Sequence, residues 1–228
     1  LLVLSADHAI DDIQAFHEAI GVASKSAESG QLTTFGVVPA DANTGYGYNY
    51  KGQQVGAAFK VNKFIEKPNQ QTADIFLRTD DYLWNSGMFM FKATILLAEL
   101  GHHSAEIVKA VTLSVENSEH DHDFIRLEEW AFAASPSIAI DYALMEKSDN
   151  VVVIPLAAGW SDVGSWSSLQ EAGKKDTHGN VITGDVIAQE TTNSYINATS
   201  HLVTTIGLDN IIIMDTTDAL FVADIGKS

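Results

Sequence analysis

The sequence of 228 residues contains no cysteine, few basic residues and no long apolar run. Without cysteine the chain can form neither a disulfide nor a thiolate metal site, which fits a reducing compartment, so we expect a cytoplasmic protein. A membrane-spanning helix needs about 18 consecutive apolar residues, and no segment approaches that length. The first residues also lack the pattern of a signal peptide, so we expect no membrane partner.

Acidic residues greatly outnumber basic ones. The chain holds 13 Lys and Arg against 30 Asp and Glu, which gives a formal net charge of −17. This charge disfavours nucleic acids and anionic membrane surfaces as partners. A phosphate-bearing ligand can bind such a chain where a metal ion and a few lysines reverse the local field. We therefore expect carboxylates that can hold a cation, with lysines near them.

The first three quarters of the chain alternate strand and helix patterns. Residues 1–4 and 32–38 read as buried strands, and a helical pattern opens at Asp11 and Asp12 and stops at Gly30. This order is typical of an α/β protein with an open, mixed but mostly parallel sheet. Further patterns predict strands over 58–66, 84–91 and 151–156, short helices over 71–78 and 166–172, and mostly helical structure over 93–148.

The pattern changes near His178. From there short apolar runs alternate with turns, and helical periodicity disappears. We therefore expect a second, small all-β domain over residues 177–228, resembling a short solenoid of parallel β turns. Residues 1–176 would form the first domain.

Two aspartates follow predicted strands directly. Asp7 comes after the strand over residues 1–4, and Asp162 follows the strand over residues 151–156. Ligands of open α/β sheets bind at the carboxyl ends of strands, and two carboxylates there could hold one Mg²⁺. Each aspartate could instead cap a helix or a turn.

Four further motifs carry polar groups suited to a sugar phosphate. Glu66 and Lys67 end a strand before a proline; they could bind a hydroxyl and a phosphate, or form an exposed ion pair. Gly45 lies in a glycine-rich loop that a ligand can approach closely. Asn85 could bind a sugar hydroxyl or cap a turn, and Lys147 could face a phosphate or solvent.

In their order along the chain, six segments resemble the sugar-phosphate nucleotidylyltransferase family, most of all its bacterial mannose-1-phosphate guanylyltransferase branch. They are LVLSADHAI, TGYGY, FIEKP, LWNSGMF, SIAIDYALMEK and AGWSDVGSW. The resemblance implies a Rossmann-like nucleotidyltransferase domain over residues 1–176, followed by a small left-handed β-helix. It also implies that Asp7 and Asp162 bind the metal, Mg²⁺, that Glu66 and Asn85 bind sugar hydroxyls, that Gly45 lies beside the sugar, and that Lys67 lies near its phosphate.

The resemblance further implies a reaction. GMP would pass from GTP to mannose 1-phosphate, giving GDP-mannose and pyrophosphate, with Asp7, Asp162 and Lys67 as the catalytic residues. Members commonly dimerise, so we also expect a homodimer. Two alternatives stay open: the same chemistry on glucose 1-phosphate with UTP, dTTP or ATP, or a catalytically silent nucleotide-sugar-binding subunit.

One family feature is missing from the sequence. Members carry a glycine-rich GxGxRLxP loop on the first strand–helix connection, where it cradles the triphosphate and helps to select the base. The chain starts at Leu1 without this loop. We therefore expect residues upstream to be missing, and a polypeptide that truly starts at Leu1 to be inactive. Whether an isomerase domain follows Ser228 is left open.

Overall fold

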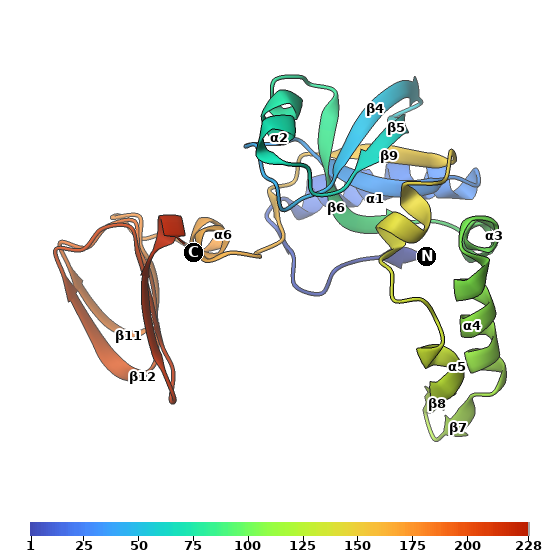
Figure 1. Ribbon diagram of the computed structural model, residues 1–228. Helices are drawn as coiled ribbons and strands as arrows, with labels where there is room; N and C mark the ends of the chain where they lie inside the picture. Colours follow the sequence, from blue (N-terminus) through green and yellow to red (C-terminus); the bar gives the residue numbers. More distant parts are fainter. Residues whose placement is uncertain (228) are drawn as a thin grey trace. The chain divides into compact units, whose positions relative to one another are not determined.

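The computed structural model describes residues 1–227, and contacts divide the chain into two compact units (Figure 1). Unit 1 comprises residues 1–5 and 12–158; unit 2 comprises residues 6–11 and the chain from Gly159 onward. These units are defined by contacts and are not the same as folding domains, so the predicted domain boundary after residue 176 stays a prediction.

Unit 1 is built on a mixed sheet with the strand order β1-β6-β3-β9-β5-β4. Its central strands β3 and β9 are almost wholly buried, as expected for apolar runs in a sheet covered on both faces. The strands are β1 (Leu2–Val3), β3 (Leu32–Val37), β4 (Tyr48–Val55), β5 (Ala58–Ile65), β6 (Tyr82–Met90) and β9 (Val151–Leu156). The predicted α/β class is confirmed, and strands lie in the predicted segments at β1, β3, β5, β6 and β9, whereas β4 was not predicted.

The prediction of a mostly parallel sheet is wrong. Among the pairings described in this sheet, β3 with β9 is parallel, whereas β1–β6, β3–β6, β4–β5, β4–β6 and β5–β9 are antiparallel. The connections explain the difference. Only Gly56 and Ala57 join β4 to β5, and a two-residue link permits only an antiparallel hairpin, since a parallel pair needs a crossover.

Helices cover both faces of this sheet. On one face lies α1 (Ile13–Glu28), whose N-cap Asp12 accepts a hydrogen bond from the Ala15 backbone and whose Phe16 contacts Phe35 of β3. The other face carries the π-helical turn η1 (Asp141–Met145) and α3 (Ala93–His103). Leu144 and Met145 of η1 pack there into the apolar core with residues from β3, β5, β6 and β9.

One local prediction in unit 1 is wrong, and another holds except at one hairpin. The strand over residues 1–4 was expected to be buried, but β1 lies at the end of the strand order and its side chains are exposed. The helical pattern over 93–148 holds for α3, α4 (Ala105–Glu116) and the short α5 (Glu129–Ala133), but β7 (Glu119–Asp121) and β8 (Phe124–Arg126) form a hairpin between them. His122 has a positive φ of 53° at its turn, which a helix does not allow. The remaining helix of unit 1 is α2 (Gln70–Leu77).

Unit 2 contains a small sheet with the order β11-β12-β13-β14. Its strands are β11 (Val181–Gln189), β12 (Tyr195–Ile206), β13 (Ile211–Asp215) and β14 (Leu220–Asp224). The pairs β11–β12 and β12–β13 are parallel, and β14 returns antiparallel to β13. The predicted small β region is therefore present, while its left-handed helical course stays a prediction. Unit 2 also holds β2 (Ala9–Ile10), β10 (Trp160–Ser161), α6 (Trp166–Ala172) and η2 (Ile225–Lys227).

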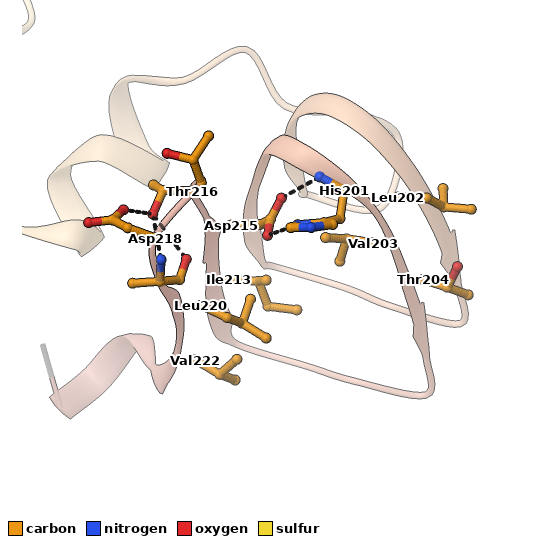
Figure 2. A pocket seen from close by; sticks show the side chains of 12 residues that line it. His201, Leu202, Val203, Thr204, Ile213, Asp215, Thr216, Asp218, Leu220 and Val222 are labelled. Atoms are coloured by element: carbon orange, nitrogen blue, oxygen red, sulfur yellow. Dashed lines mark hydrogen bonds and ion pairs between the residues drawn. The ribbon is translucent and has the colours of Figure 1, made fainter.

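A hollow of about 570 Å³ lies on this small sheet beside β12, β13 and β14 (Figure 2). Leu220 and Val222 line it together with the pair His201 and Asp215. The Asp215 carboxylate accepts hydrogen bonds from the backbone N–H groups of Ser200 and His201, at 3.0 and 2.7 Å, and pairs with the His201 ring at 2.9 Å. These bonds hold the bend in β12, so we assign Asp215 a structural role. No helix in residues 1–227 is long and apolar enough to cross a membrane.

Candidate active site

In unit 1, four polar residues from three segments come together, and we call them the Asn85 cluster: Glu66, Lys67, Asn85 and Asp141. Glu66 and Lys67 follow the end of β5, Asn85 lies on β6, and Asp141 begins η1. Three of the four were predicted site residues, and the structure brings those three together. Asp141 lay within a motif singled out in the sequence but had no assigned role.

The side-chain amide of Asn85 is the centre of the cluster. Its Nδ2 donates a hydrogen bond to Asp141 Oδ1 at 3.1 Å, and its Oδ1 accepts one from Thr34 Oγ1 at 3.0 Å. Its backbone N–H donates to Gly47 O at 2.7 Å, which ties β6 to the glycine-rich loop. Asn85 is only half-buried, so the amide stays accessible to a ligand while its orientation is held.

Glu66 and Lys67 differ in their exposure. The Lys67 side chain is 64% exposed and that of Glu66 only 14%, with Lys67 Nζ 3.7 Å from Glu66 Oε1. Burial raises the pKa of Glu66 and the negative charge of Asp141 adds to the rise, which the positive charge of Lys67 only partly offsets. Lys67 has a positive φ of 44°, an uncommon backbone for a residue other than glycine and one often found at functional sites.

Asp141 is in a comparable situation. Burial raises its pKa, and the hydrogen bond from Asn85 and the charge of Lys67 only partly counter this effect. Burial and the charge of Asp141 together also raise the pKa of the neighbouring, exposed Glu146. Of these acids, Glu66 and Asp141 belong to the cluster, and with few donors around them they retain capacity to accept hydrogen bonds from a polyhydroxylated ligand.

The loop glycine that the cluster requires is Gly47. A Cβ at Gly47 would overlap the Glu66 carboxylate, so only glycine lets that side chain lie against the loop. At Gly45, the predicted site residue, a Cβ would meet Asn43 Oδ1 at 3.1 Å, and the Gly45 N–H donates to the same oxygen at 2.8 Å. Gly45 therefore shapes the loop, and its role beside a ligand stays a prediction.

Lys147 follows η1 and is exposed. Its charge acts on Glu146, whose raised pKa it partly offsets. Its predicted contact with a phosphate stays a prediction.

In unit 2, the two predicted metal-binding aspartates flank one short strand pairing. β2 and β10 pair antiparallel, with Ala9 opposite Ser161. Asp7 precedes β2 and Asp162 follows β10, so both lie at the same end of this ladder. Trp160 Nε1 donates to His8 Nδ1 at 3.1 Å, which fixes the two segments to each other. The pairing therefore brings Asp7 and Asp162 into one neighbourhood, from positions 155 residues apart in the sequence.

The turn after Asp162 is backbone-strained. Val163 has a positive φ of 51°, which is a genuine outlier for a β-branched residue. Its N–H donates to Ser161 Oγ, and the Gly164 N–H donates to Asp162 Oδ1, each at 3.1 Å. A Cβ at Gly164 would lie 2.9 Å from Asp162 Oδ2, so glycine lets the carboxylate fold over the turn. The turn at Val163 and Gly164 therefore holds the Asp162 carboxylate over its own backbone.

The aspartate pair, Asp7 and Asp162, suits one kind of metal ion. Carboxylate oxygens are hard ligands, and Mg²⁺ is usually held by one or two carboxylates together with water and substrate phosphates. No group of three or more His, Cys, Asp or Glu side chains that could hold a metal occurs within residues 1–227. The pair therefore fits a magnesium ion that shares its ligands with a phosphate, and does not fit a metal held by protein groups alone.

Comparison with known proteins decides the family. Residues 1–179 match the nucleotidyl transferase family, which is more than three quarters of the chain. The chain belongs to the nucleotidyl transferase family. In this family context the Asn85 cluster and the aspartate pair both lie within the matched residues.

Relatives in the nucleotidyl transferase family extend over nearly the whole chain. A putative mannose-1-phosphate guanylyltransferase of Vibrio cholerae is 47% identical over 225 residues, covering 98% of this chain and 48% of that protein. A mannose-1-phosphate guanylyltransferase of Escherichia coli K12 is 46% identical over 229 residues, covering 98% and 48%. This chain therefore spans about half the length of these two relatives.

Solved structures agree with the α/β nucleotidyltransferase fold. A crystal structure from Thermus thermophilus, described as a mannose-1-phosphate geranyltransferase, has a TM-score of 0.88 and 30% identity. The match covers 99% of this chain and 65% of that one. The agreement across 99% of the chain includes the small sheet of unit 2.

Sequence reasoning did not assign Thr34, Gly47 or Asp141 to the site. Asp141 contacts Asn85 across 56 sequence positions and Thr34 does so across 51, so no local pattern reveals either contact. The second glycine of TGYGY was visible, but which glycine faces Glu66 depends on how the loop folds.

Proposed function

We propose that this chain forms the nucleotidyltransferase part of a mannose-1-phosphate guanylyltransferase, which transfers GMP from GTP to mannose 1-phosphate and releases pyrophosphate. One observation carries the proposal: relatives named for this activity are 46–47% identical across 98% of the chain. The chemistry of the Asn85 cluster and of the aspartate pair supports it, since a hydroxyl-binding cluster and a pair of metal ligands are what such substrates require.

The Asn85 cluster would bind the mannose. Glu66 accepts hydrogen bonds from sugar hydroxyls, and its low exposure lets those bonds form away from competing water. Asn85 binds a further hydroxyl through its held amide, and Gly45 lies in the loop next to the sugar. Burial and the charge of Asp141 raise the pKa of Glu66, and a hydroxyl donor from the sugar would stabilise its charged form.

The reaction would proceed by in-line displacement at phosphorus. An oxygen of the mannose phosphate attacks the α-phosphorus of GTP and forms a new P–O bond, while the bond between the α-phosphorus and the bridging oxygen to the β-phosphate breaks. The electron pair leaves with pyrophosphate. No side-chain nucleophile is needed, because such transfers depend on positioning and on stabilisation of charge.

Four further residues would orient the phosphates. Asp7 and Asp162 would hold Mg²⁺, which supplies positive charge to phosphate oxygens when it is bound. The exposed ammonium of Lys67 would hold the phosphate of the incoming sugar, and Lys147 would add positive charge next to η1. The strained turn at Val163 supports the role of Asp162, since strain of this kind is retained where a side chain must be aimed.

Three features beyond the site complete the proposal. The parallel stack of β11, β12 and β13 would follow the course of a small left-handed β-helix. The protein would act as a homodimer, and it would work in the cytoplasm. Light scattering at several protein concentrations tests the dimer: a constant mass equal to one chain would contradict it.

The test is a substrate panel on the whole protein. GTP, UTP, dTTP and ATP are each combined with mannose 1-phosphate and with glucose 1-phosphate in the presence of Mg²⁺, and pyrophosphate release is measured. We expect GTP with mannose 1-phosphate to be the best pair by at least about tenfold, the discrimination of one or two lost polar contacts. A different best pair would assign a different sugar nucleotide, and binding of GDP-mannose without turnover would indicate a silent binding subunit.

A further inference from the structure

We propose that Asp141 is a positioning residue that fixes the side-chain amide of Asn85 in one orientation, so that Asn85 meets the sugar as a hydrogen-bond donor. The inference rests on the proposed function for the identity of the ligand, a hexose phosphate. It goes beyond that function by assigning Asp141 a role and by specifying which atom of Asn85 faces the sugar.

The hydrogen-bond capacity of the Asn85 amide limits how it can meet a ligand. An asparagine side chain has two N–H donors and one oxygen acceptor, and a flip about its last bond exchanges their positions. One N–H of Asn85 is used by Asp141 Oδ1 at 3.1 Å, and the oxygen accepts from Thr34 Oγ1 at 3.0 Å. The second N–H of Nδ2 is then left for the ligand, and Asn85 is half-buried, so a ligand can reach it.

Of the two partners, only Asp141 can select this orientation. The Thr34 hydroxyl is fully buried and can either donate or accept, so it would satisfy both orientations of the amide. An ionised carboxylate can only accept. A flipped Asn85 would place its oxygen against the Asp141 oxygen and leave two acceptors facing each other. Asp141 therefore decides which side of the amide faces outward.

The backbone holds Asp141 in place for this task. It begins the π-helical turn η1, in which the Glu146 N–H donates to Asp141 O at 2.9 Å, and π turns are frequent at functional sites. Leu144 and Met145 of the same turn are 0% and 2% exposed in the core. Ser104 Oγ donates to the Ala143 carbonyl at 2.7 Å, which satisfies a carbonyl that the irregular turn frees. The turn is thus anchored in the core while its first residue reaches Asn85.

The test is a double-mutant cycle in the whole protein, with Asp141→Asn, Asn85→Ala and the double variant. Asp141→Asn keeps the side-chain shape but lets the group donate or accept, so it no longer selects the orientation of Asn85. We expect it to raise the KM for mannose 1-phosphate about tenfold, as for loss of one well-oriented hydrogen bond, and to leave the KM for GTP within about twofold. In the Asn85→Ala background the same change should add less than about twofold, because Asp141 acts through Asn85.

A matched control is Glu146→Gln, which removes a charge from an exposed neighbour of Asp141 and leaves the hydrogen bond to Asn85 intact. It should change neither KM by more than about twofold. An unchanged KM for mannose 1-phosphate in Asp141→Asn would overturn the inference. So would multiplicative effects in the double variant, which would mean that Asp141 acts independently of Asn85.

Failure of the proposed function would be visible separately. If the wild-type protein turns over no pair of substrates, the cycle is read by calorimetric binding of mannose 1-phosphate and glucose 1-phosphate instead. Tighter binding to wild type than to Asp141→Asn, with no further loss in the double variant beyond that of Asn85→Ala, would support the inference. Equal binding, or no binding of either sugar phosphate to wild type, would overturn it.

Discussion

Carboxylates in unit 1 and in unit 2 have pKa values shifted in opposite directions. In the Asn85 cluster, burial raises the pKa values of Glu66 and Asp141, and their partners Lys67 and Asn85 do not compensate. In the small sheet, the His201 ring and backbone hold the pKa of Asp215 below its ordinary value. The Thr192 hydroxyl and the Asn193 amide do the same for the pKa of Asp209.

The direction of the pKa shift distinguishes acids that stabilise the fold from acids proposed to bind a ligand. Asp215 has its oxygens satisfied by three donors of its own chain, so its charge stabilises the fold. Glu66 and Asp141 are half-buried and raise each other's energy as charged groups, at a cost in stability, and they lack donors that would satisfy all their oxygens. We therefore regard Asp215 as a structural acid, and Glu66 and Asp141 as acids of the proposed site.

The largest effect is expected for Asp162→Asn in unit 2, where the proposed metal ligand lies in the same unit as the structural acids. Loss of a metal ligand should lower kcat roughly 100- to 1000-fold, since the bound ion contributes several kcal/mol to the transition state. The melting temperature should change little, because Asp162 is only partly buried. Pyrophosphate release and differential scanning fluorimetry measure the two quantities. Asp218→Asn, a turn acid whose partner is Thr216, is the control, and near-full activity of Asp162→Asn would refute the metal assignment.

Glu66→Gln tests whether an acid of the Asn85 cluster serves ligand binding at a cost in stability. We expect the KM for mannose 1-phosphate to rise roughly 10- to 100-fold, because hydrogen bonds to a charged acceptor contribute about 1.5–3 kcal/mol. The melting temperature at pH 7 should nevertheless rise, by roughly 1–3 °C, because the substitution removes a buried charge. A pKa raised in the folded state means that the Glu66 charge opposes folding above that pKa, so the gain should vanish at pH values where wild-type Glu66 is protonated. A loss of stability at pH 7 would place Glu66 among the structural acids.

Gly47→Ala should have a smaller effect through the same acid. The added Cβ would overlap the far end of the flexible Glu66 side chain, which can move aside at little cost in stability. The Glu66 carboxylate would then be displaced from its position in the Asn85 cluster. We expect kcat/KM for mannose 1-phosphate to fall roughly 3- to 10-fold, since displacing a binding group by about 1 Å weakens its contacts. Gly45→Ala is the matched variant in the same loop, where the Cβ meets only Asn43. A larger loss in Gly45→Ala than in Gly47→Ala would place the ligand next to Gly45 instead.

These glycines also show what the sequence alone can and cannot predict. The elements that local patterns predict were found: α1 with its Asp12 cap, the buried β3 and β9, and the helix after Ser165. Their signals lie within a few residues of each other, in periodicity and capping. Glu66, Lys67 and Asn85 could be singled out because their motifs are local as well, and the structure places them together.

The remaining features depend on contacts between distant segments. The apolar pattern of each strand does not reveal its direction of pairing; the two-residue link makes β4–β5 antiparallel, and β4–β6 pairs antiparallel across more distant segments, so the expected mostly parallel sheet was wrong. The link from Asp141 to Asn85 spans 56 positions, and an Asp in a helical pattern gives no sign of its partner. The exposure of β1 depends on its place at the sheet edge.

The smallest effect on turnover is expected for Asp215→Asn, which should leave activity within about twofold and act on stability alone. An asparagine has one acceptor oxygen where the carboxylate has two, so it cannot accept from both the His201 ring and the two backbone N–H groups. The melting temperature at pH 7 should therefore fall by roughly 2–5 °C. Because the pKa of Asp215 is lowered by folding, its stabilising effect is present above the ordinary aspartate pKa of about 3.9 and is lost as the pH falls through the lower folded-state value. The difference in melting temperature between wild type and variant should therefore narrow progressively as the pH falls below about 4, which circular dichroism can follow. A difference that persists unchanged at pH 3, or a loss of turnover at pH 7, would mean that Asp215 is not a purely structural acid and that the contrast with Glu66 does not hold.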